Sequence, residues 1–179
     1  MTGTDRPGEP RRQETVVRRA APSDVDLVME VVTRLLRELS GVPDRTLAEA
    51  SRSAAEELLG DPSRGLVLLA DLDHAPARAS RAAVPVGILT ASFPFAVRTA
   101  GRYALIEELF VSPQARGAGV GAALVSGLLG ELATAGIRTV EVGLPSHRFA
   151  QEPRTRSFYS RQGFRSIGLR MRLQSGDTA

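Results

Sequence analysis

The chain has 179 residues, of which 42% are hydrophobic and 24% are charged, a balance typical of a globular domain. It contains no cysteine, which excludes disulfides, thiolate metal sites and a cysteine nucleophile. The sequence has no run near 18 apolar residues and no apolar segment at the N-terminus, so we expect no membrane span and no secretory signal, and we predict a cytoplasmic protein.

The charge is divided unevenly along the chain. All 23 positive side chains are arginines: residues 1–90 hold 12 of them against 14 acids (net −2), and residues 91–179 hold 11 against 6 (net +5). A basic second half suits an anionic ligand. Because aromatic residues make up only 4% and no nucleic-acid-binding module is visible, we expect no nucleic-acid partner. With two histidines and no cysteine, we expect no metal.

The first half alternates between helical and extended patterns. Residues 1–14 are polar and rich in proline, which predicts a disordered tail. Apolar spacing predicts helices at 25–40, with Ser23 as the N-cap, and at 47–59. We expect the extended segments in this half to form an antiparallel arrangement; they are residues 15–19, 66–70 and 84–93, with a loop at 71–83.

The second half has a more regular order. A strand at 103–111 leads through a glycine-rich turn into a helix at 119–135, which Gly136 closes. A strand at 137–144, a loop at 145–153, a short helix at 154–162 and a strand at 164–173 follow. These elements predict one mixed α/β domain over 15–173, with about six strands, about four helices, an antiparallel first half, a parallel βαβ second half and a tail at 174–179.

The glycine-rich turn carries the strongest chemical signal. Gly117, Gly119 and Gly121 alternate just before a helix, so the backbone can bend sharply and direct several N–H groups to one place. The positive end of the helix dipole lies there too, which favours phosphate oxygens, and Arg116 is placed to add a charged contact. The alternative is that the glycines serve only close packing of strand and helix.

Two phosphate-binding modules fit this turn. Gly117-x-Gly119-x-x-Ala122, with Glu141 as the later acid, satisfies a dinucleotide fingerprint and leaves an NAD(P)-binding oxidoreductase as an alternative. Five residues, 112–116, separate its first glycine from the strand, which argues against that fold. A P-loop needs a lysine, and the chain has none.

The second module is the acyl-CoA-binding signature of the GCN5-related N-acetyltransferase (GNAT) superfamily. Arg116-x-x-Gly119-x-Gly121, preceded by LFVSP at 109–113, resembles that signature, and FYSRQGF at 158–164 resembles the C-terminal "FYxxxGF" motif. Residues 17–24 are similar to the opening strand-to-helix segment. The resemblance covers about residues 15–173 and implies the GNAT-like acyl-CoA N-acyltransferase fold.

The resemblance also implies an activity: direct transfer of an acetyl group from acetyl-CoA, the co-substrate, to a primary amine of a small molecule or a protein. It implies that the acceptor pocket involves the first two helices, their loop near 39–46 and the C-terminal strand region, and it is compatible with a homodimer. It implies that backbone amides bind the co-substrate. Those nearest the acetyl carbonyl are Leu109, Phe110 and Val111, and those at the pyrophosphate are Arg116, Gly117, Ala118, Gly119, Val120, Gly121 and Ala122.

Three residues are candidates for proton transfer. The resemblance implies that Tyr159 is the general acid, although it could instead only pack beside Phe158. Glu107 and Glu108 are candidate bases in an otherwise apolar strand, and the resemblance favours Glu107, nine positions before Arg116. Strand alternation predicts that the two lie on opposite faces, Glu107 with Leu109 and Val111 and Glu108 with Phe110.

Other interpretations stay open. Either glutamate could pair with an arginine or face solvent, and His147 in the loop at 144–153 is a candidate secondary base. A non-catalytic acyl-CoA-binding or regulatory module on the same fold is the main alternative to an enzyme. The presence of both Glu107 and Tyr159 favours the enzyme.

Overall fold

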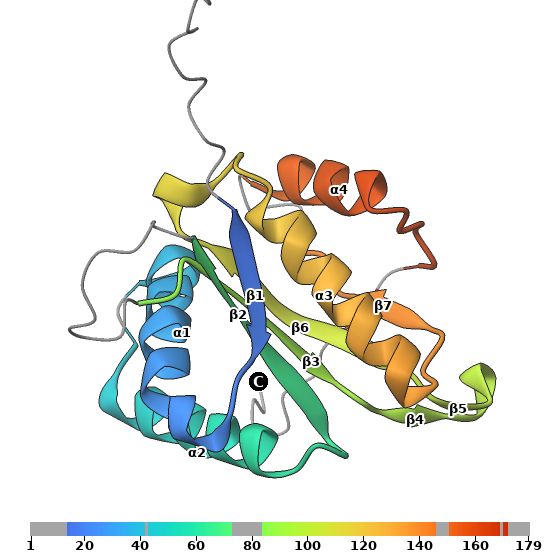
Figure 1. The fold of residues 1–179 in the computed structure, drawn as a ribbon, viewed down its shortest axis with the longest axis horizontal. Coiled ribbons are helices and arrows are strands. Elements are labelled where there is room, and N and C mark those ends of the chain that lie inside the picture. Colours follow the sequence, from blue (N-terminus) through green and yellow to red (C-terminus); the bar gives the residue numbers. More distant parts are fainter. Residues whose placement is uncertain (1–13, 42, 73–83, 146–150, 169, 172–179) are drawn as a thin grey trace, which may run out of the picture.

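The computed structural model describes residues 14–41, 43–72, 84–145, 151–168 and 170–171. A five-stranded mixed sheet forms its centre, in the order β1-β2-β3-β6-β7 (Figure 1). The first four strands pair antiparallel, whereas β6 and β7 run parallel. The strands are β1 (Thr15–Arg19), β2 (Gly65–Leu72), β3 (Gly87–Ser92), β6 (Ala104–Val111) and β7 (Val140–Val142).

Helices cover both faces of this sheet. Helices α1 (Val25–Ser40) and α2 (Arg45–Gly60) bury one side of β2, β3 and β6, in a core cluster that includes Val31, Ile88 and Phe110. Helix α3 (Val120–Ala135) covers the opposite face, and α4 (Glu152–Arg161) packs beside its first turn (Figure 1). The mixed α/β architecture predicted from the sequence is therefore confirmed.

The helix ends show which local signals were correct. Gly136 closes α3 at φ +70°, as predicted, whereas the cap of α2 was not predicted: Asp44 accepts a 2.8 Å hydrogen bond from the Leu47 N–H. Ser23 is not the N-cap of α1. Residues Pro22–Asp24 instead form a 3-10 turn, and the carboxylate of Asp24 accepts from the Ala21 N–H and from Arg18.

Two strand predictions differ from the structure. Residues 94–102, where the sequence predicted no strand, contain a two-stranded sheet of β4 (Phe95–Ala96) and β5 (Gly101–Arg102), too short to leave a periodic signal. The strand predicted at 164–173 is absent from its described residues, 164–168 and 170–171. Gly168 has φ +136°, which interrupts the extended backbone that a strand requires.

Several expectations concern residues beyond those described: the tails at 1–13 and 172–179, the loop at 73–83 and His147 within 146–150. In the described part of the chain, no helix is long and apolar enough to cross a membrane. The same residues contain no cluster of three or more histidines or carboxylates that could hold a metal ion.

Candidate active site

The central sheet opens beside β6. Strands β6 and β7 pair only over Ala104–Ile106 and Val140–Val142. From 107 to 111, β6 is paired with β3 on one side, and no described strand pairs with it on the other; we call this stretch the open edge of β6. The Ser112 N–H bonds toward β3, to the Val86 carbonyl at 2.8 Å. Because backbone groups alternate along a strand, the N–H groups of Leu109 and Val111 point to the open edge.

The glycine turn begins where β6 ends. Gly117 and Gly119 have φ of +87° and +89°, in the left-handed region, and an added Cβ would meet nothing within 4 Å at either position. Their requirement for glycine is therefore conformational, and the surface of the turn is open. Gly121 differs, because a Cβ there would lie 3.2 Å from the Phe158 ring. The packing explanation therefore applies to the third glycine and the conformational explanation to the first two.

Five amides at this turn have no backbone acceptor among the described residues. The first hydrogen bond of α3 runs from the Ala123 N–H to the Gly119 carbonyl at 3.0 Å, so the amides that precede it are unpaired. The unpaired amides are those of Gly117, Gly119, Val120, Gly121 and Ala122. The amides of Arg116 and Ala118 instead make long bonds of 3.3 and 3.4 Å within the preceding 3-10 segment. The turn thus offers a compact set of donors for an anion at the positive end of α3.

The side chain of Arg116 is directed away from those amides. Its Nε donates to the Val111 carbonyl at 2.9 Å, and its Nη2 donates to Glu38 of α1. Its guanidinium also lies 5.8 Å from the centre of the Phe110 ring. The structure therefore places the side chain of this arginine on the α1 side of the sheet. The sequence analysis instead predicted that this side chain contacts a phosphate.

A β-bulge in β6 changes the predicted placement of the two glutamates. Thr90 of β3 pairs with Glu108, but Ala91 pairs with Ile106, so Glu107 is an extra residue. A bulge interrupts the strict alternation of faces. The prediction that the two carboxylates lie on opposite faces is therefore wrong.

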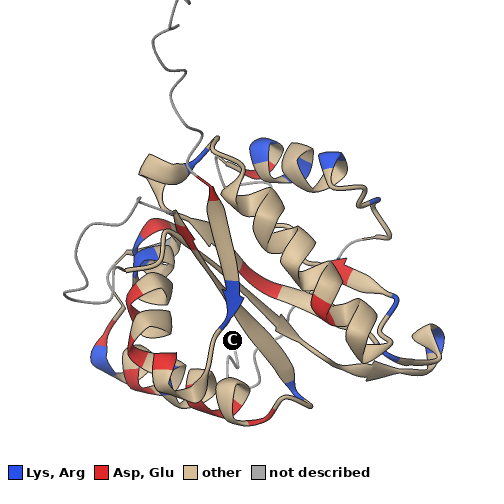
Figure 2. Ribbon diagram, viewed as in Figure 1, with Lys and Arg blue, Asp and Glu red and all other residues tan. Residues whose placement is uncertain are grey.

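Both carboxylates instead bond to hydroxyls on the same face of β3. The Ser92 hydroxyl donates to Glu107 at 2.6 Å, and the buried Thr90 hydroxyl donates to Glu108. Thr90 and Ser92 are two residues apart on a regular strand, so they point to the α1–α2 face. Figure 2 shows this acidic segment of β6 among largely uncharged strands. The sequence analysis missed these two hydroxyls. The pattern that could have indicated them is a pair of hydroxyl residues, Thr90 and Ser92, at i and i+2 in an otherwise apolar strand.

The two glutamates have different environments. Glu107 is exposed, whereas Glu108 is half-buried. Burial raises the pKa of the Glu108 carboxyl, the negative charge of Glu107 raises it further, and the hydrogen bond from Thr90 opposes both effects. Among the described ion pairs, neither carboxylate has an arginine partner, so the alternative that one of them pairs with an arginine finds no support there. Burial therefore makes the Glu108 carboxylate a stronger proton acceptor than an exposed glutamate.

Tyr159 lies in the core beside the glycine turn. Only 6% of the residue is exposed, and its ring stacks edge-to-face between Phe158 and Phe164, with centroids 5.1 and 5.3 Å away. Burial raises its pKa well above the ordinary tyrosine value, so the hydroxyl stays protonated at neutral pH. None of the described residues hydrogen-bonds to that hydroxyl. The geometry accommodates both the packing interpretation and a proton donor.

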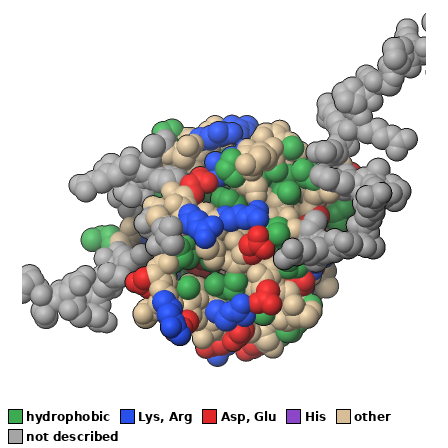
Figure 3. All heavy atoms as spheres, turned by 90° about the vertical axis from the view of Figure 1, so that its left-hand side faces the viewer, with side chains coloured by type: hydrophobic (Ala, Val, Ile, Leu, Met, Phe, Trp, Pro, Cys, Tyr) green, Lys and Arg blue, Asp and Glu red, His purple; other side chains and the backbone are tan. Residues whose placement is uncertain are grey.

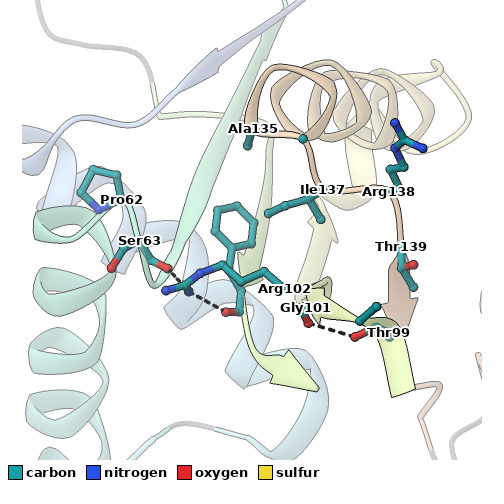
Figure 4. Close-up of a pocket in the computed structure, with 12 residues that line it drawn as sticks. Pro62, Ser63, Thr99, Gly101, Arg102, Ala135, Ile137, Arg138 and Thr139 are labelled. Atoms are coloured by element: carbon teal, nitrogen blue, oxygen red, sulfur yellow. Dashed lines mark hydrogen bonds between the residues drawn. The ribbon is translucent and has the colours of Figure 1, made fainter. Parts of the chain in front are cut away.

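A side-chain cavity near α3 lies away from the glycine turn. A cavity of about 440 Å³ sits at the C-terminal end of α3, between that helix, β5 and the start of β2 (Figure 4). None of the predicted site residues lines it. Arg102 reaches across its wall to the carbonyls of Ser63 and Phe93, at 2.8 and 3.1 Å. Glu141, the acid of the dinucleotide alternative, is held by Arg98, which keeps the pKa of its carboxyl low.

The fold is thus a mixed α/β domain whose central sheet opens beside a glycine turn and the N-terminus of α3. The family model described as "Acetyltransferase (GNAT) domain" matches residues 78–166. The matched range contains both the glycine turn and the FYSRQGF motif, so the resemblance to the GNAT superfamily noted from these motifs is confirmed.

Solved structures of similar fold match nearly the whole chain. The aminoglycoside N-acetyltransferase AAC(6')-Iy in complex with CoA has a TM-score of 0.72 at 18% identity, over 94% of this chain and 99% of that chain. Ribosomal-protein-alanine N-acetyltransferase from Brucella melitensis biovar Abortus 2308 has 0.67 at 15%, over 90% and 99%. An integron cassette protein from the mobile metagenome of Cole Harbour Salt Marsh has 0.67 at 24%, over 91% of each chain. No curated relative matches the chain.

Proposed function

We propose that the protein is an acetyl-CoA-dependent N-acetyltransferase that transfers the acetyl group directly to a primary amine. The observation that carries the proposal is the open edge of β6, which ends beside the five unpaired amides of the glycine turn. An elongated thioester co-substrate with a pyrophosphate needs both features together, one for its arm and one for its anion. Direct transfer agrees with the absence of any cysteine that could carry an acyl group.

The described residues fit such a co-substrate. The amides of Gly117 and of Gly119–Ala122 would hold the pyrophosphate without needing a charged side chain. The N–H groups of Leu109 and Val111 would orient the arm and the acetyl carbonyl along the open edge, while Phe110 faces the core below α1. Acetyl-CoA supplies the activated acetyl group, and the protein supplies position and proton transfer.

The glutamate pair provides the base in this proposal. An amine must lose a proton before it can act as a nucleophile, and both carboxylates face the α1–α2 side, where the resemblance places the acceptor. Glu107 is exposed enough to take that proton, directly or through water. Glu108 lies behind Glu107, and because burial raises the pKa of the Glu108 carboxyl, this group can accept the same proton. The negative charge of the pair also favours a cationic amine over a neutral one.

Tyr159 is the proposed proton donor to the departing thiolate. Its hydroxyl remains protonated at neutral pH, which a general acid requires. Its ring is held on both sides by aromatic neighbours, so its position is fixed by packing. Packing and proton donation are therefore compatible, and a substitution that removes only the hydroxyl separates them.

The acceptor class is the open part of the proposal. AAC(6')-Iy has been solved with a bisubstrate analogue made of CoA and monomethyl-acetylneamine, and the Brucella structure is named for ribosomal-protein alanine. These two neighbours span small-molecule amines and protein amino groups. We propose a small cationic amine first, because the paired carboxylates of β6 complement a positive charge.

The experiment couples binding to turnover. Isothermal titration with CoA tests the co-substrate site, and release of free CoA thiol is followed over a panel of polyamines, aminoglycosides, amino acids and N-terminal peptides. Turnover on at least one amine supports the enzyme. CoA binding with no turnover on the whole panel, unchanged by Glu107→Gln or Tyr159→Phe, would favour the non-catalytic module. A response to NAD(P) with none to CoA would contradict both.

A further inference from the structure

We propose that the Glu38–Arg116 ion pair is a positioning device that couples occupancy of the glycine turn to the last turn of α1. Because the resemblance places the acceptor at the end of α1, the pair would link the two substrate sites. This inference rests on the proposed function. It assigns the Arg116 side chain to a link between two elements and leaves co-substrate binding to the backbone amides.

Three contacts hold the guanidinium of Arg116 in one place. Nε donates to the carbonyl of Val111 at 2.9 Å, Nη2 donates to Glu38, and the group lies 5.8 Å from the Phe110 ring centre. Val111 ends the open edge and Gly117 begins the glycine turn, so Arg116 sits at the junction of the two parts of the site. A side chain fixed in this way also fixes its own backbone.

This pair is different from the Glu30–Arg34 pair of the same helix. Glu30 and Arg34 are one helical turn apart and 47% and 38% exposed, so their contact stays within the helix. The face of the molecule that carries α1 and α2 shows basic and acidic side chains interspersed in this way (Figure 3). Glu38 and Arg116 are separated by 78 positions, and their side chains are 33% and 28% exposed. Among the described ion pairs, Arg116 is the least exposed arginine.

The last turn of α1 has few other attachments among the described residues. Residues 37–39 are exposed, and the C-cap bond from the Gly41 N–H to the Arg37 carbonyl is long, at 3.3 Å. Such an end frays readily on its own. An anion bound to the amides next to Arg116 restricts that backbone, and the ion pair passes the restriction to Glu38. Coupling of this kind is reciprocal, so ordering of α1 by an acceptor would tighten co-substrate binding equally.

The test follows backbone amide exchange at the end of α1 with CoA itself as the probe. Hydrogen–deuterium exchange of a peptide covering 33–41 is measured with and without saturating CoA, and CoA affinity is measured by calorimetry. The variants are Glu38→Ala, Glu38→Gln, which keeps an oxygen acceptor, and the matched control Glu30→Ala on the same helix. We expect CoA to slow exchange about threefold or more in the wild type and in Glu30→Ala, and partly in Glu38→Gln.

In Glu38→Ala we expect this slowing to vanish, while the Kd for CoA rises only about threefold. Equal slowing in Glu38→Ala and wild type, or no slowing in a wild type that binds CoA, overturns the coupling and leaves the proposed function intact. Absence of CoA binding in the wild type overturns both proposals. Slow exchange of the β2 and β3 amides in the absence of CoA shows that a variant is folded. If Glu38→Ala is not folded, the comparison is made with Glu38→Gln.

Discussion

The two ends of helix α3 differ in whether their backbone polar groups have partners. At the N-terminal end, five amides of the glycine turn have no backbone acceptor among the described residues, and residues 117–119 are exposed. At the C-terminal end, the carbonyls of Ala133 and Leu132 accept bonds from Gly136 and Ile137, and Arg102 satisfies two further carbonyls in the wall of the adjacent cavity. The carbonyls of Ser63, Phe93 and Gly101 around this cavity thus already have hydrogen-bond partners. Unpaired backbone donors, and not volume, distinguish the proposed ligand site.

A substitution at Gly119 should have the largest effect on the proposed ligand site at the N-terminal end of α3. The Gly119 φ of +89° lies in a region that a β-branched residue avoids, so Gly119→Val should distort the turn and misdirect its amides. We expect CoA affinity to fall by roughly 100-fold, an effect of about 3 kcal/mol. Gly130→Ala is the matched control, because Gly130 lies within α3 with an ordinary φ and open space around its Cβ position. Comparable CoA binding by Gly119→Val and Gly130→Ala would contradict the assignment of the turn.

The glutamate pair should give the next largest effect. Glu107→Gln and Glu108→Gln each remove a proposed proton acceptor but retain an oxygen for Ser92 or Thr90. We expect kcat to fall about 100-fold for the residue that acts as base, with little change in CoA affinity. Measured from pH 5 to 9, wild-type kcat/KM should rise with pH as the catalytic base loses its proton. This rise should be absent in the variant that lacks the base. Full activity in both variants would leave the pair with a structural role.

Tyr159→Phe separates chemistry from packing. The ring remains between Phe158 and Phe164, while the hydroxyl is lost. We expect kcat to fall about 10–100-fold, with thermal stability within 2 °C of wild type. Tyr159→Ala, in contrast, should destabilise the fold by about 3–5 kcal/mol, since it empties a core position that is only 6% exposed. Wild-type turnover in Tyr159→Phe would reduce Tyr159 to its packing function.

Many features of the fold and of the proposed site could be predicted from the sequence because the patterns that indicate them are local. The alternating glycines predicted the turn, the apolar spacing predicted α1 and α2, and Gly136 predicted the end of α3. The face of Glu107 was not accessible, because a bulge depends on the register against β3 and leaves no local pattern. The partner of Arg116 was hidden for the same reason: Glu38 is 78 positions away, and only the packed sheet brings them together.

The half-buried carboxyl of Glu108 makes a separate prediction for stability. Its pKa is raised in the folded state, so the folded protein binds this proton more tightly than the unfolded chain. The stabilisation is therefore present at low pH and is lost as pH rises through the folded-state pKa. Glu108→Gln should raise the melting temperature slightly at pH 7–8, by about 1–3 °C, and leave it unchanged near pH 4. A gain at pH 4 equal to that at pH 8 would contradict burial as the cause.

The smallest effect on activity is expected at the other end of α3. Arg102→Ala removes the donor to the Ser63 and Phe93 carbonyls and opens the cavity wall there (Figure 4). Because these carbonyls lie near the surface, we expect a loss of only about 0.5–1.5 kcal/mol in the free energy of unfolding. CoA affinity and turnover should stay within twofold of wild type, since α3 itself is capped by Gly136 and not by this arginine. Chemical denaturation and calorimetry with CoA measure the two quantities on one preparation. A large loss of CoA binding without unfolding would mean that the two ends of α3 are coupled, and that the cavity belongs to the functional site.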